Sequence, residues 1–295
     1  MDKPTILMTG ATGLVGSRFV EMYGHKYNVV NMDLTTGVDI TKIETFKPFF
    51  DSNKDVKTLI HLAAFTDTTR AQAELGDKQG VTYQVNVQGT KNIADVCREY
   101  GIHLIHISTD FVFDGKSGEP YTEESPVSPL DWYGQTKAMA ESVVQESGVD
   151  YTILRLSYPY RAAYDLKPDL IKKIRTGLEA GNLPPQFTDS IITPTFVDDL
   201  ARSFDRVIEL RPTGILHTVG STSLSPYDLA TKVATAFGFD PNLVQAGSLT
   251  EYLKSSTRPF ARTVALSNQK ATQLLGIKYL TIAAGLAEVQ RQQGL

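Results

Sequence analysis

A tyrosine and a lysine four residues apart, Tyr133 and Lys137, are the pair in this sequence best suited to proton transfer. Residues at this spacing share one face of a helix, so the lysine ammonium can sit beside the phenol. A free tyrosine has a pKa of about 10, and a nearby cation brings that pKa closer to neutral pH. The pair therefore predicts a proton donor, although exposed helices also carry this spacing without any function.

A hydroxyl group that could act with this pair belongs to Thr109, which lies 24 residues before Tyr133 in the stretch Ser108-Thr109-Asp110. This stretch ends a predicted strand, and its hydroxyl could hydrogen-bond the same substrate oxygen. Thr109, Tyr133 and Lys137 are therefore the predicted catalytic residues. Together they would form an acid and an electrostatic clamp for a carbonyl group.

A glycine-rich loop, Gly10–Gly16, follows the first apolar run and opens a helical pattern. Glycines leave room for a tight turn, for backbone N–H groups to approach a pyrophosphate, and for close packing of helix on strand. The N-terminus of the helix adds an electropositive end for phosphates. Although a glycine-rich turn can be only a turn, this context predicts dinucleotide contacts at Gly10, Thr12, Gly13, Leu14, Val15 and Gly16.

An acidic residue, Asp33, ends the second predicted strand 23 residues after Gly10. An acid at this place can accept hydrogen bonds from the adenosine ribose, and no Arg or Lys lies between Asp33 and Thr41 to receive a 2′-phosphate. NAD(H) is therefore favoured over NADP(H), while the plain alternative is an acid that starts a loop. Asp39 and Ile40 could border the adenine, although helix capping alone would explain Asp39.

The third predicted strand leads into small residues that could support a cofactor. Ligands of open α/β sheets bind at the carboxyl ends of the strands. Ala63, Ala64 and Phe65 follow this strand and are predicted cofactor contacts, although small residues can also serve packing alone. Asn86 would interrupt a helix and could hold a water or a backbone group beneath Lys137, or could simply precede a helix.

Strands and helices alternate along the first half of the chain, which predicts parallel βαβ units and a doubly wound Rossmann sheet. After Leu156 the pattern loosens, and we expect a smaller, interwoven C-terminal substrate lobe. The predicted division is an NAD-binding domain at 1–156, with returning elements around 190–220, and a mainly substrate-binding lobe at 157–295. The predicted strands are Thr5–Met8, Asn28–Met32, Thr58–Leu62, His103–Ile107 and Tyr151–Leu156, followed by short strands near Ser190–Ile192 and Ile215–Val219. The predicted helices include Gly13–Gly24, Gly89–Tyr100, Trp132–Ser147, Leu166–Glu179, Val197–Leu210 and Ser225–Phe237.

Composition excludes several classes of protein. The 295 residues carry 29 Lys and Arg against 33 Asp and Glu, a formal charge of −4, with no basic cluster to bind nucleic acid. Apolar runs such as Leu62 to Phe65 are far too short to span a membrane. One cysteine, Cys97, allows no internal disulfide and fits a reducing cytoplasm. No His or Cys spacing typical of a metal site occurs, so no metal is predicted.

The motifs together resemble the extended short-chain dehydrogenase/reductase superfamily and, within it, the dTDP-4-dehydrorhamnose reductase family. The resemblance covers nearly the whole chain and is most specific at Gly10–Gly16, His61–Thr66, Ile107–Gly115, Ser128–Lys137 and Thr193–Ala201. It implies that Tyr133 is the proton donor, that Lys137 is its partner and a ligand of the cofactor ribose, and that Thr109 orients the carbonyl. It also implies that Thr109, Asp110 and Tyr158 border the substrate, with Tyr158 where the family tends to carry a tryptophan.

The resemblance therefore implies a reductase that acts on a carbonyl of a nucleotide sugar, with a small-molecule substrate and a homodimer as a possible assembly. Two alternatives stay open. One is a non-catalytic, dinucleotide-binding regulatory subunit similar to the β subunit of methionine adenosyltransferase. The other is a nucleotide-sugar epimerase. Sugar-nucleotide 4,6-dehydratases carry an acid after the Thr-Asp pair, where this chain has Phe111.

Overall fold

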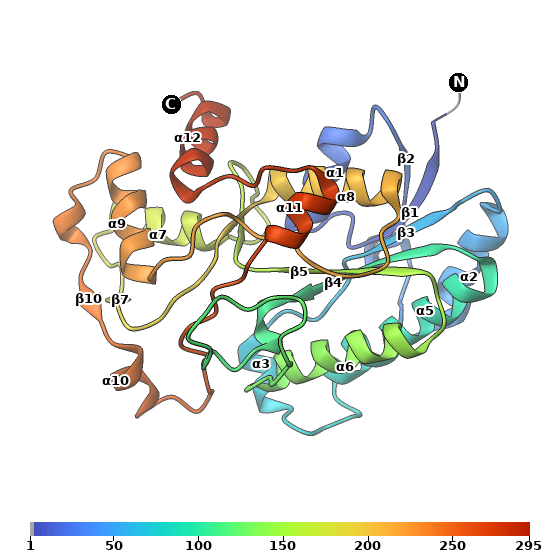
Figure 1. Ribbon diagram of the computed structural model, residues 1–295, viewed down its shortest axis with the longest axis horizontal. Helices are drawn as coiled ribbons and strands as arrows, with labels where there is room; N and C mark the ends of the chain where they lie inside the picture. The colour runs from blue at the N-terminus through green and yellow to red at the C-terminus, as the bar shows by residue number, and fades with distance from the viewer. Residues whose placement is uncertain (1–2) are drawn as a thin grey trace.

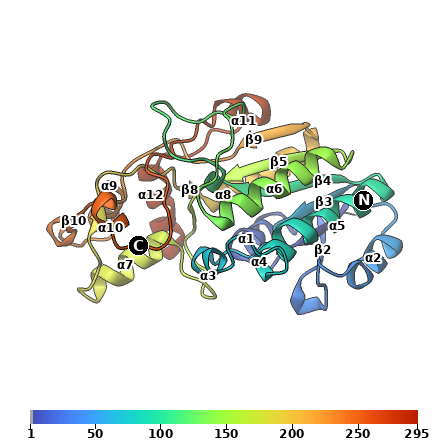
Figure 2. The same cartoon turned by 90° about the horizontal axis from the view of Figure 1, so that it is seen from below.

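The centre of the computed structural model, which describes residues 3–295, is a six-stranded sheet in the order β2-β1-β3-β4-β5-β9, shown in Figures 1 and 2. Each neighbouring pair of strands in it is parallel, as expected for a doubly wound sheet. The fold prediction is confirmed. The strands are β1 (Thr5–Thr9), β2 (Asn28–Asn31), β3 (Thr58–His61), β4 (His103–Thr109), β5 (Tyr151–Leu156) and β9 (Gly214–His217).

Helices cover both faces of this sheet because side chains alternate along each strand. In β1, Ile6 and Met8 pack into one apolar core, while Leu7 packs into the core on the opposite face. The first core includes residues of α1 (Leu14–Tyr23), α8 (Val197–Leu210) and α11 (Gln269–Leu275). The second includes residues of α2 (Ile43–Ser52), α5 (Thr90–Tyr100) and α6 (Trp132–Glu146).

A smaller lobe with its own apolar core lies beside the sheet, at the left of Figure 1. The chain is interwoven, because α8 and β9 return to the large sheet after the lobe has begun. The domain boundary at 156 stays a prediction. The lobe contains α7 (Leu170–Glu179), α9 (Pro226–Ala236), α10 (Leu249–Leu253), α12 (Ile282–Gln293) and two strand pairs, β6 (Pro159–Tyr160) with β8 (Thr195–Phe196) and β7 (Gln186–Phe187) with β10 (Ala246–Gly247).

Two predicted elements differ from the structure. The segment Ser190–Ile192 is not a strand: Ile191 and Ile192 make isolated bridges to different segments, and Pro194, which follows closely, removes a backbone donor. Helix α7 begins at Leu170 rather than Leu166, since Pro168 precedes its capping residue. The remaining short elements are α3 (Thr68–Ala73), α4 (Val81–Tyr83), the 3₁₀ turns η1 (Leu34–Thr36), η3 (Asp110–Val112) and η4 (Pro241–Leu243), and the π-helical turn η2 (Gln84–Gly89).

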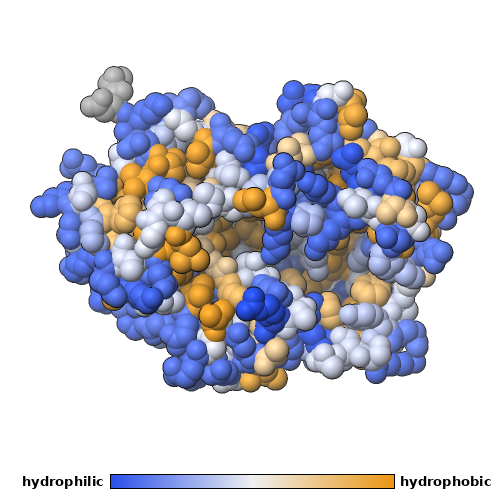
Figure 3. All heavy atoms as spheres, turned by 180° about the vertical axis from the view of Figure 1, so that it is seen from behind, coloured by the Kyte–Doolittle hydropathy of each residue, from blue (hydrophilic) through white to orange (hydrophobic). Residues whose placement is uncertain are grey.

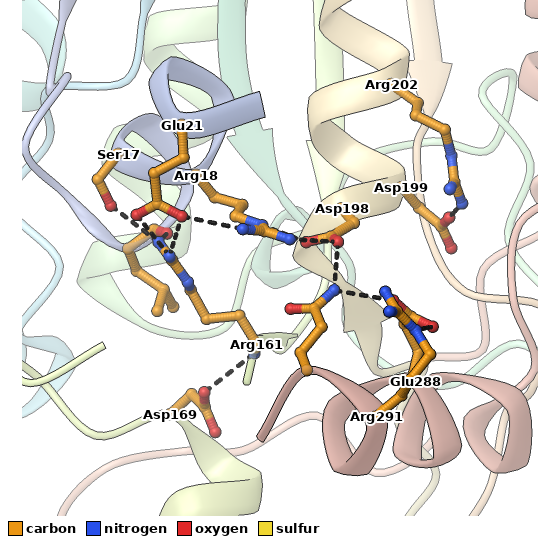
Figure 4. Close-up of polar contacts among 12 residues, drawn as sticks. Ser17, Arg18, Glu21, Arg161, Asp169, Asp198, Asp199, Arg202, Glu288 and Arg291 are labelled. Carbon is orange, nitrogen blue, oxygen red and sulfur yellow. Dashed lines mark hydrogen bonds and ion pairs between the residues drawn. The ribbon is translucent and has the colours of Figure 1, made fainter. Parts of the chain in front are cut away.

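Arg161 ties the lobe to the glycine-loop helix. Its guanidinium donates to the Leu14 carbonyl oxygen at 3.2 Å, to the Ser17 hydroxyl at 2.8 Å and to both carboxylate oxygens of Glu21 at 2.7 Å, as Figure 4 shows in part. Its backbone N–H donates to Asp169, the N-cap of α7. The loop that binds phosphate in Rossmann folds is therefore held against the lobe.

A search of the helices within residues 3–295 finds none with the length and apolar character of a membrane span.

Candidate active site

A cleft of about 950 Å³ lies at the carboxyl ends of the sheet strands and is lined by both halves of the molecule. Figure 3 shows a face that is hollowed near its middle, with apolar side chains exposed in the hollow. The volume is at the upper end for ligand sites. The predicted site residues that line it are Gly10, Thr12, Gly13, Leu14, Val15, Gly16, Asp33, Asp39, Ile40, Ala63, Ala64, Thr109, Asp110, Tyr133, Lys137 and Tyr158.

Phe65 is the one predicted contact that does not line the cleft. The Arg70 guanidinium lies over its ring, 5.3 Å from the centroid. Its backbone N–H donates to Asn86 Oδ1 at 2.8 Å, and its carbonyl oxygen accepts from Asn86 Nδ2 at 3.2 Å. Asn86 lies within η2, so it does interrupt the helix and hold a backbone group. These two bonds fix the course of the chain after β3.

The glycine loop requires glycine at two of its positions. Gly10 has φ of +71°, and a Cβ there would lie 2.8 Å from Leu62 Cβ. A Cβ on Gly16 would collide with the Gly10 carbonyl oxygen. The turn is therefore as tight as a dinucleotide-binding loop needs, with helix α1 starting directly after it.

Asp33 fastens this loop. One carboxylate oxygen accepts from the backbone N–H groups of Gly10 and Ala11, and the other accepts from the Thr12 backbone at 2.9 Å and the Thr12 hydroxyl at 2.8 Å. A carboxylate has about four lone-pair sites, so the loop uses its full acceptor capacity. The sequence predicts an Asp33 carboxylate that is free to accept from a ribose, whereas in the structure the loop already occupies it. A ribose hydroxyl must displace or share one of these hydrogen bonds.

Asp39 and Ile40 form another part of the cleft wall. The Asp39 carboxylate accepts from both the backbone and the hydroxyl of Thr41, and these bonds lower the pKa of Asp39. Ile40 packs against Gly89, where a Cβ would lie 2.7 Å from the Ile40 side chain. The helix cap expected as the alternative for Asp39 is not present, because Lys42 is the N-cap of α2 and no side chain caps that helix. Asp39 instead holds the turn before the helix while it lines the cleft.

The predicted catalytic residues lie together at the end of β4 and the start of α6. The Thr109 hydroxyl donates to Asp110 Oδ1 at 3.0 Å, and Phe111 packs edge-on against the Tyr133 ring at 5.4 Å. Burial raises the pKa of Tyr133, the charge of Asp110 raises it further, and a hydrogen bond with Thr109 opposes the rise. Tyr133 therefore carries its proton at neutral pH, as a donor must.

Lys137 differs from the expectation that its ammonium lies against the phenol. Lys137 Nζ donates to the Ile107 carbonyl oxygen at 2.6 Å and lies 3.3 Å from His106 Nε2. Burial lowers the pKa of Lys137 to about 8, while Glu141 acts in the opposite direction. The lysine is therefore anchored to β4, and Tyr133 keeps a raised pKa instead of the lowered one expected from the pair.

Asp110 and Tyr158 border the far end of the cleft. Burial raises the pKa of Asp110 to about 6, although hydrogen bonds from Ser157 and Thr109 oppose this change. Tyr158 has φ of +40°, a left-handed conformation that is rare for a bulky side chain and clusters at functional sites. The Thr195 backbone N–H donates to the Tyr158 carbonyl oxygen at 3.3 Å, which helps to hold this conformation.

The lobe adds residues to the cleft that no sequence motif indicated, notably Tyr164, Lys167 and Lys173. Tyr164 donates to the Thr12 carbonyl oxygen at 3.0 Å, and Lys167 Nζ donates to the Thr66 hydroxyl at 3.0 Å. These residues follow the carboxyl end of β5, and ligands of open α/β sheets bind at that edge, so this position could have indicated them.

Within residues 3–295, no His, Cys, Asp and Glu cluster is suited to a metal ion.

The chain is similar to several proteins named as reductases of nucleotide sugars. The dTDP-4-keto-6-deoxy-D-glucose reductase of Streptomyces niveus is 30% identical over 81% of each chain. The dTDP-4-dehydrorhamnose reductase of Mycolicibacterium smegmatis is 29% identical over 91% of this chain and 79% of its own. The structure of the dTDP-4-dehydrorhamnose reductase of Bacillus anthracis, solved with NADP, covers 99% of this chain and all of its own with a TM-score of 0.88. At 24% identity, that likeness supports the fold alone.

The family assignment rests on nearly the whole chain. The family model described as the RmlD substrate binding domain matches residues 4–293. This range includes the glycine loop, the β4 hydroxyl, the Tyr133 and Lys137 pair, and the lobe. The resemblance found in the motifs is therefore confirmed, and the chain belongs to the RmlD substrate binding domain family.

Proposed function

We propose that the protein reduces a carbonyl group on a nucleotide sugar, using a reduced nicotinamide dinucleotide as hydride donor and Tyr133 as proton donor. The observation that carries the proposal is a single cleft that the glycine loop, Thr109, Tyr133 and Lys137 all line. The relatives' names describe reductases of this class, which confirms the predicted oxidoreductase activity.

The chain's own residues would divide the work between orientation and proton transfer. A bound nicotinamide supplies hydride to the carbonyl carbon. The Thr109 hydroxyl orients the carbonyl oxygen, and Tyr133 gives that oxygen its proton, so the product is an alcohol. The Lys137 ammonium stabilises the negative charge that develops near the phenol. The raised pKa of Tyr133 suits a donor that must be protonated before the reaction.

For the cofactor, we favour NAD(H) over NADP(H). Asp33 lines the cleft at the end of β2, and its carboxylate would repel a 2′-phosphate. The 33–41 segment that follows contains no Arg or Lys to offset this charge. The Bacillus anthracis relative was solved with NADP, so the preference must be measured. Assembly as a homodimer and location in the cytoplasm stay predictions.

The decisive experiment measures NADH oxidation against a panel of 4-keto nucleotide sugars and simple ketones, with NADPH run in parallel. We expect turnover with a nucleotide sugar, little with simple ketones, and a higher kcat/KM with NADH. Preference for NADPH would overturn the role given to Asp33. No turnover with any carbonyl, together with capture of a stoichiometric enzyme partner, would favour the regulatory-subunit alternative.

A further inference from the structure

Two buried histidines lie beneath the catalytic lysine, and the proposed reaction gives them no role. His61 on β3 and His106 on β4 are register partners in the parallel sheet, each is 1% exposed, and their ring centroids are 5.4 Å apart. His106 Nε2 lies 3.3 Å from Lys137 Nζ. Buried imidazoles against a buried ammonium are electrostatically costly, so their arrangement needs an explanation.

Hydrogen bonds determine the proton position on His61. The Thr90 hydroxyl donates to the Asn86 carbonyl oxygen at 2.7 Å, so it accepts from His61 Nε2 at 3.1 Å. His61 Nδ1 is then the acceptor for the Thr9 hydroxyl at 2.7 Å. Burial and the charge of Lys137 lower the pKa of His61 to about 3. This ring is therefore neutral, with both nitrogens satisfied.

His106 is neutral for the same reasons but has only one satisfied nitrogen. Burial first, and then the charge of Lys137, lower the pKa of His106 well below its usual value. A neutral ring with a lone pair on Nε2 can accept an N–H of the ammonium. Nδ1 must then carry the proton, and it is buried without a partner in the described part of the chain. A buried donor without a partner destabilises the folded chain, which argues that the ring serves through its other nitrogen.

The ammonium of Lys137 has three N–H groups, and the sheet engages two of them. One donates to the Ile107 carbonyl oxygen at 2.6 Å and a second faces His106 Nε2. We propose that His106 is a positioning residue whose neutral imidazole holds the Lys137 ammonium with its third N–H directed into the cleft. The inference rests on the proposed function, because it assigns that third N–H to the cofactor and the reacting oxygen.

The other groups around this pair support a fixed orientation. Asn86 Nδ2 donates to the Thr136 hydroxyl at 3.1 Å, which ties η2 to the turn of α6 that carries Lys137. The titratable group that acts on Lys137 from its own helix is Glu141, whose carboxylate is paired with Arg155 of β5 at 2.6 Å. From the sheet side, the titratable groups are His61 and His106 themselves. No acid other than Glu141 is therefore available to hold the ammonium in the described contacts.

The test compares His106→Phe, which keeps a ring and removes the acceptor, with His106→Gln, which keeps an acceptor oxygen. His103→Phe is the matched control, because His103 is another fully buried histidine of β4 whose Nε2 lies 2.9 Å from the Thr152 hydroxyl, outside the site. The readout is kcat/KM of the full chain from about pH 6 to about pH 10. Loss of an acceptor disfavours the ammonium, so His106→Phe should lower kcat/KM about tenfold and move its alkaline fall down by about one pH unit.

The variants separate a positioning role from a structural one. His106→Gln should restore most of the activity and the wild-type midpoint, and His103→Phe should leave the midpoint in place. A slower His106→Phe enzyme with an unmoved midpoint would overturn the inference. The affinity for dinucleotide, measured by titration over the same pH range, should weaken with the same shifted midpoint. If the wild type binds dinucleotide but reduces no nucleotide sugar, the proposed function fails while this binding experiment still tests His106.

Discussion

The cleft has a floor, formed by Thr109, Asp110, Tyr133 and Lys137, and a rim, formed by Tyr164, Lys167 and Lys173 of the lobe. The two regions hold their polar groups in different ways. On the floor, Lys137 is 3% exposed and Thr109 is 5% exposed, and hydrogen bonds to β4 and Asp110 fix both side chains. On the rim, Tyr164 and Lys167 are on the segment between β6 and α7 and reach across to Thr12 and Thr66 through single hydrogen bonds. The floor is thus built for chemistry at fixed positions, and the rim for contacts that can exchange with a ligand.

The difference assigns separate tasks to the two regions. Chemistry needs the reacting groups held within a fraction of an ångström, which buried side chains on strands and helices provide. Substrate choice depends on the groups that a ligand meets at the entrance, which the lobe supplies. The lysines of the rim, Lys167 and Lys173, are the cleft-lining cations nearest to solvent. They are therefore the groups that we expect to contact the phosphates of a nucleotide-sugar substrate.

Tyr133→Phe should have the largest effect, because it removes the proton donor from the floor and leaves the rim intact. We expect kcat to fall by about a thousandfold or more, while the Kd for NADH changes by no more than about threefold. Steady-state turnover and a dinucleotide titration on the same preparation check both numbers. Near-normal turnover in this variant would remove Tyr133 from the mechanism.

Asp110→Asn tests whether the buried carboxylate of Asp110 lowers the stability of the folded chain. The pKa of Asp110 is about 6 in the folded chain and about 3.9 when unfolded, so between these values the folded state binds more protons. The contribution of Asp110 to the free energy of unfolding therefore falls as pH rises, by about 3 kcal/mol in total. The Asn variant should lack that fall, so urea unfolding at about pH 4 and pH 7 should show the wild type losing more stability than the variant. Parallel changes in the two proteins would contradict the raised pKa.

The sheet and the place of Tyr133 and Lys137 in the cleft could be predicted from sequence, whereas their contacts could not. Alternating strands and helices and a Tyr-x-x-x-Lys spacing are local signals, so β1 to β5 and the positions of Tyr133 and Lys137 followed from them. The partners of Lys137 depend on which strand lies beneath α6. The four hydrogen bonds to Asp33 likewise depend on how the glycine loop turns back over β2. Such contacts join distant segments, and no local pattern encodes them.

Asp33→Asn compares the two roles of that side chain. The amide keeps the size of Asp33 but replaces two acceptor sites with donors that face the loop N–H groups. The glycine loop should loosen, and the Kd for NADH should rise about tenfold. Because a negative charge is lost, the ratio of NADPH to NADH affinity should increase. Equal loss for both cofactors would mean that Asp33 serves the loop alone and does not select NAD(H).

Arg161→Gln should have the smallest effect and tests the tie between the lobe and the glycine-loop helix. The Arg161 side chain is 5% exposed, but its partner Glu21 is 48% exposed, so solvent weakens the pair. The variant also loses the hydrogen bonds to Leu14 and Ser17. We therefore expect its free energy of unfolding to be about 1 kcal/mol lower. The control, Arg291→Gln, removes a 71% exposed guanidinium paired with Glu288 and should leave the stability almost unchanged. Because Arg161 holds the helix that follows the glycine loop, its loss should also weaken NADH binding, whereas Arg291→Gln should not. Equal effects of the two variants in urea unfolding and NADH titration would mean that Arg161 does not hold the lobe to the glycine-loop helix.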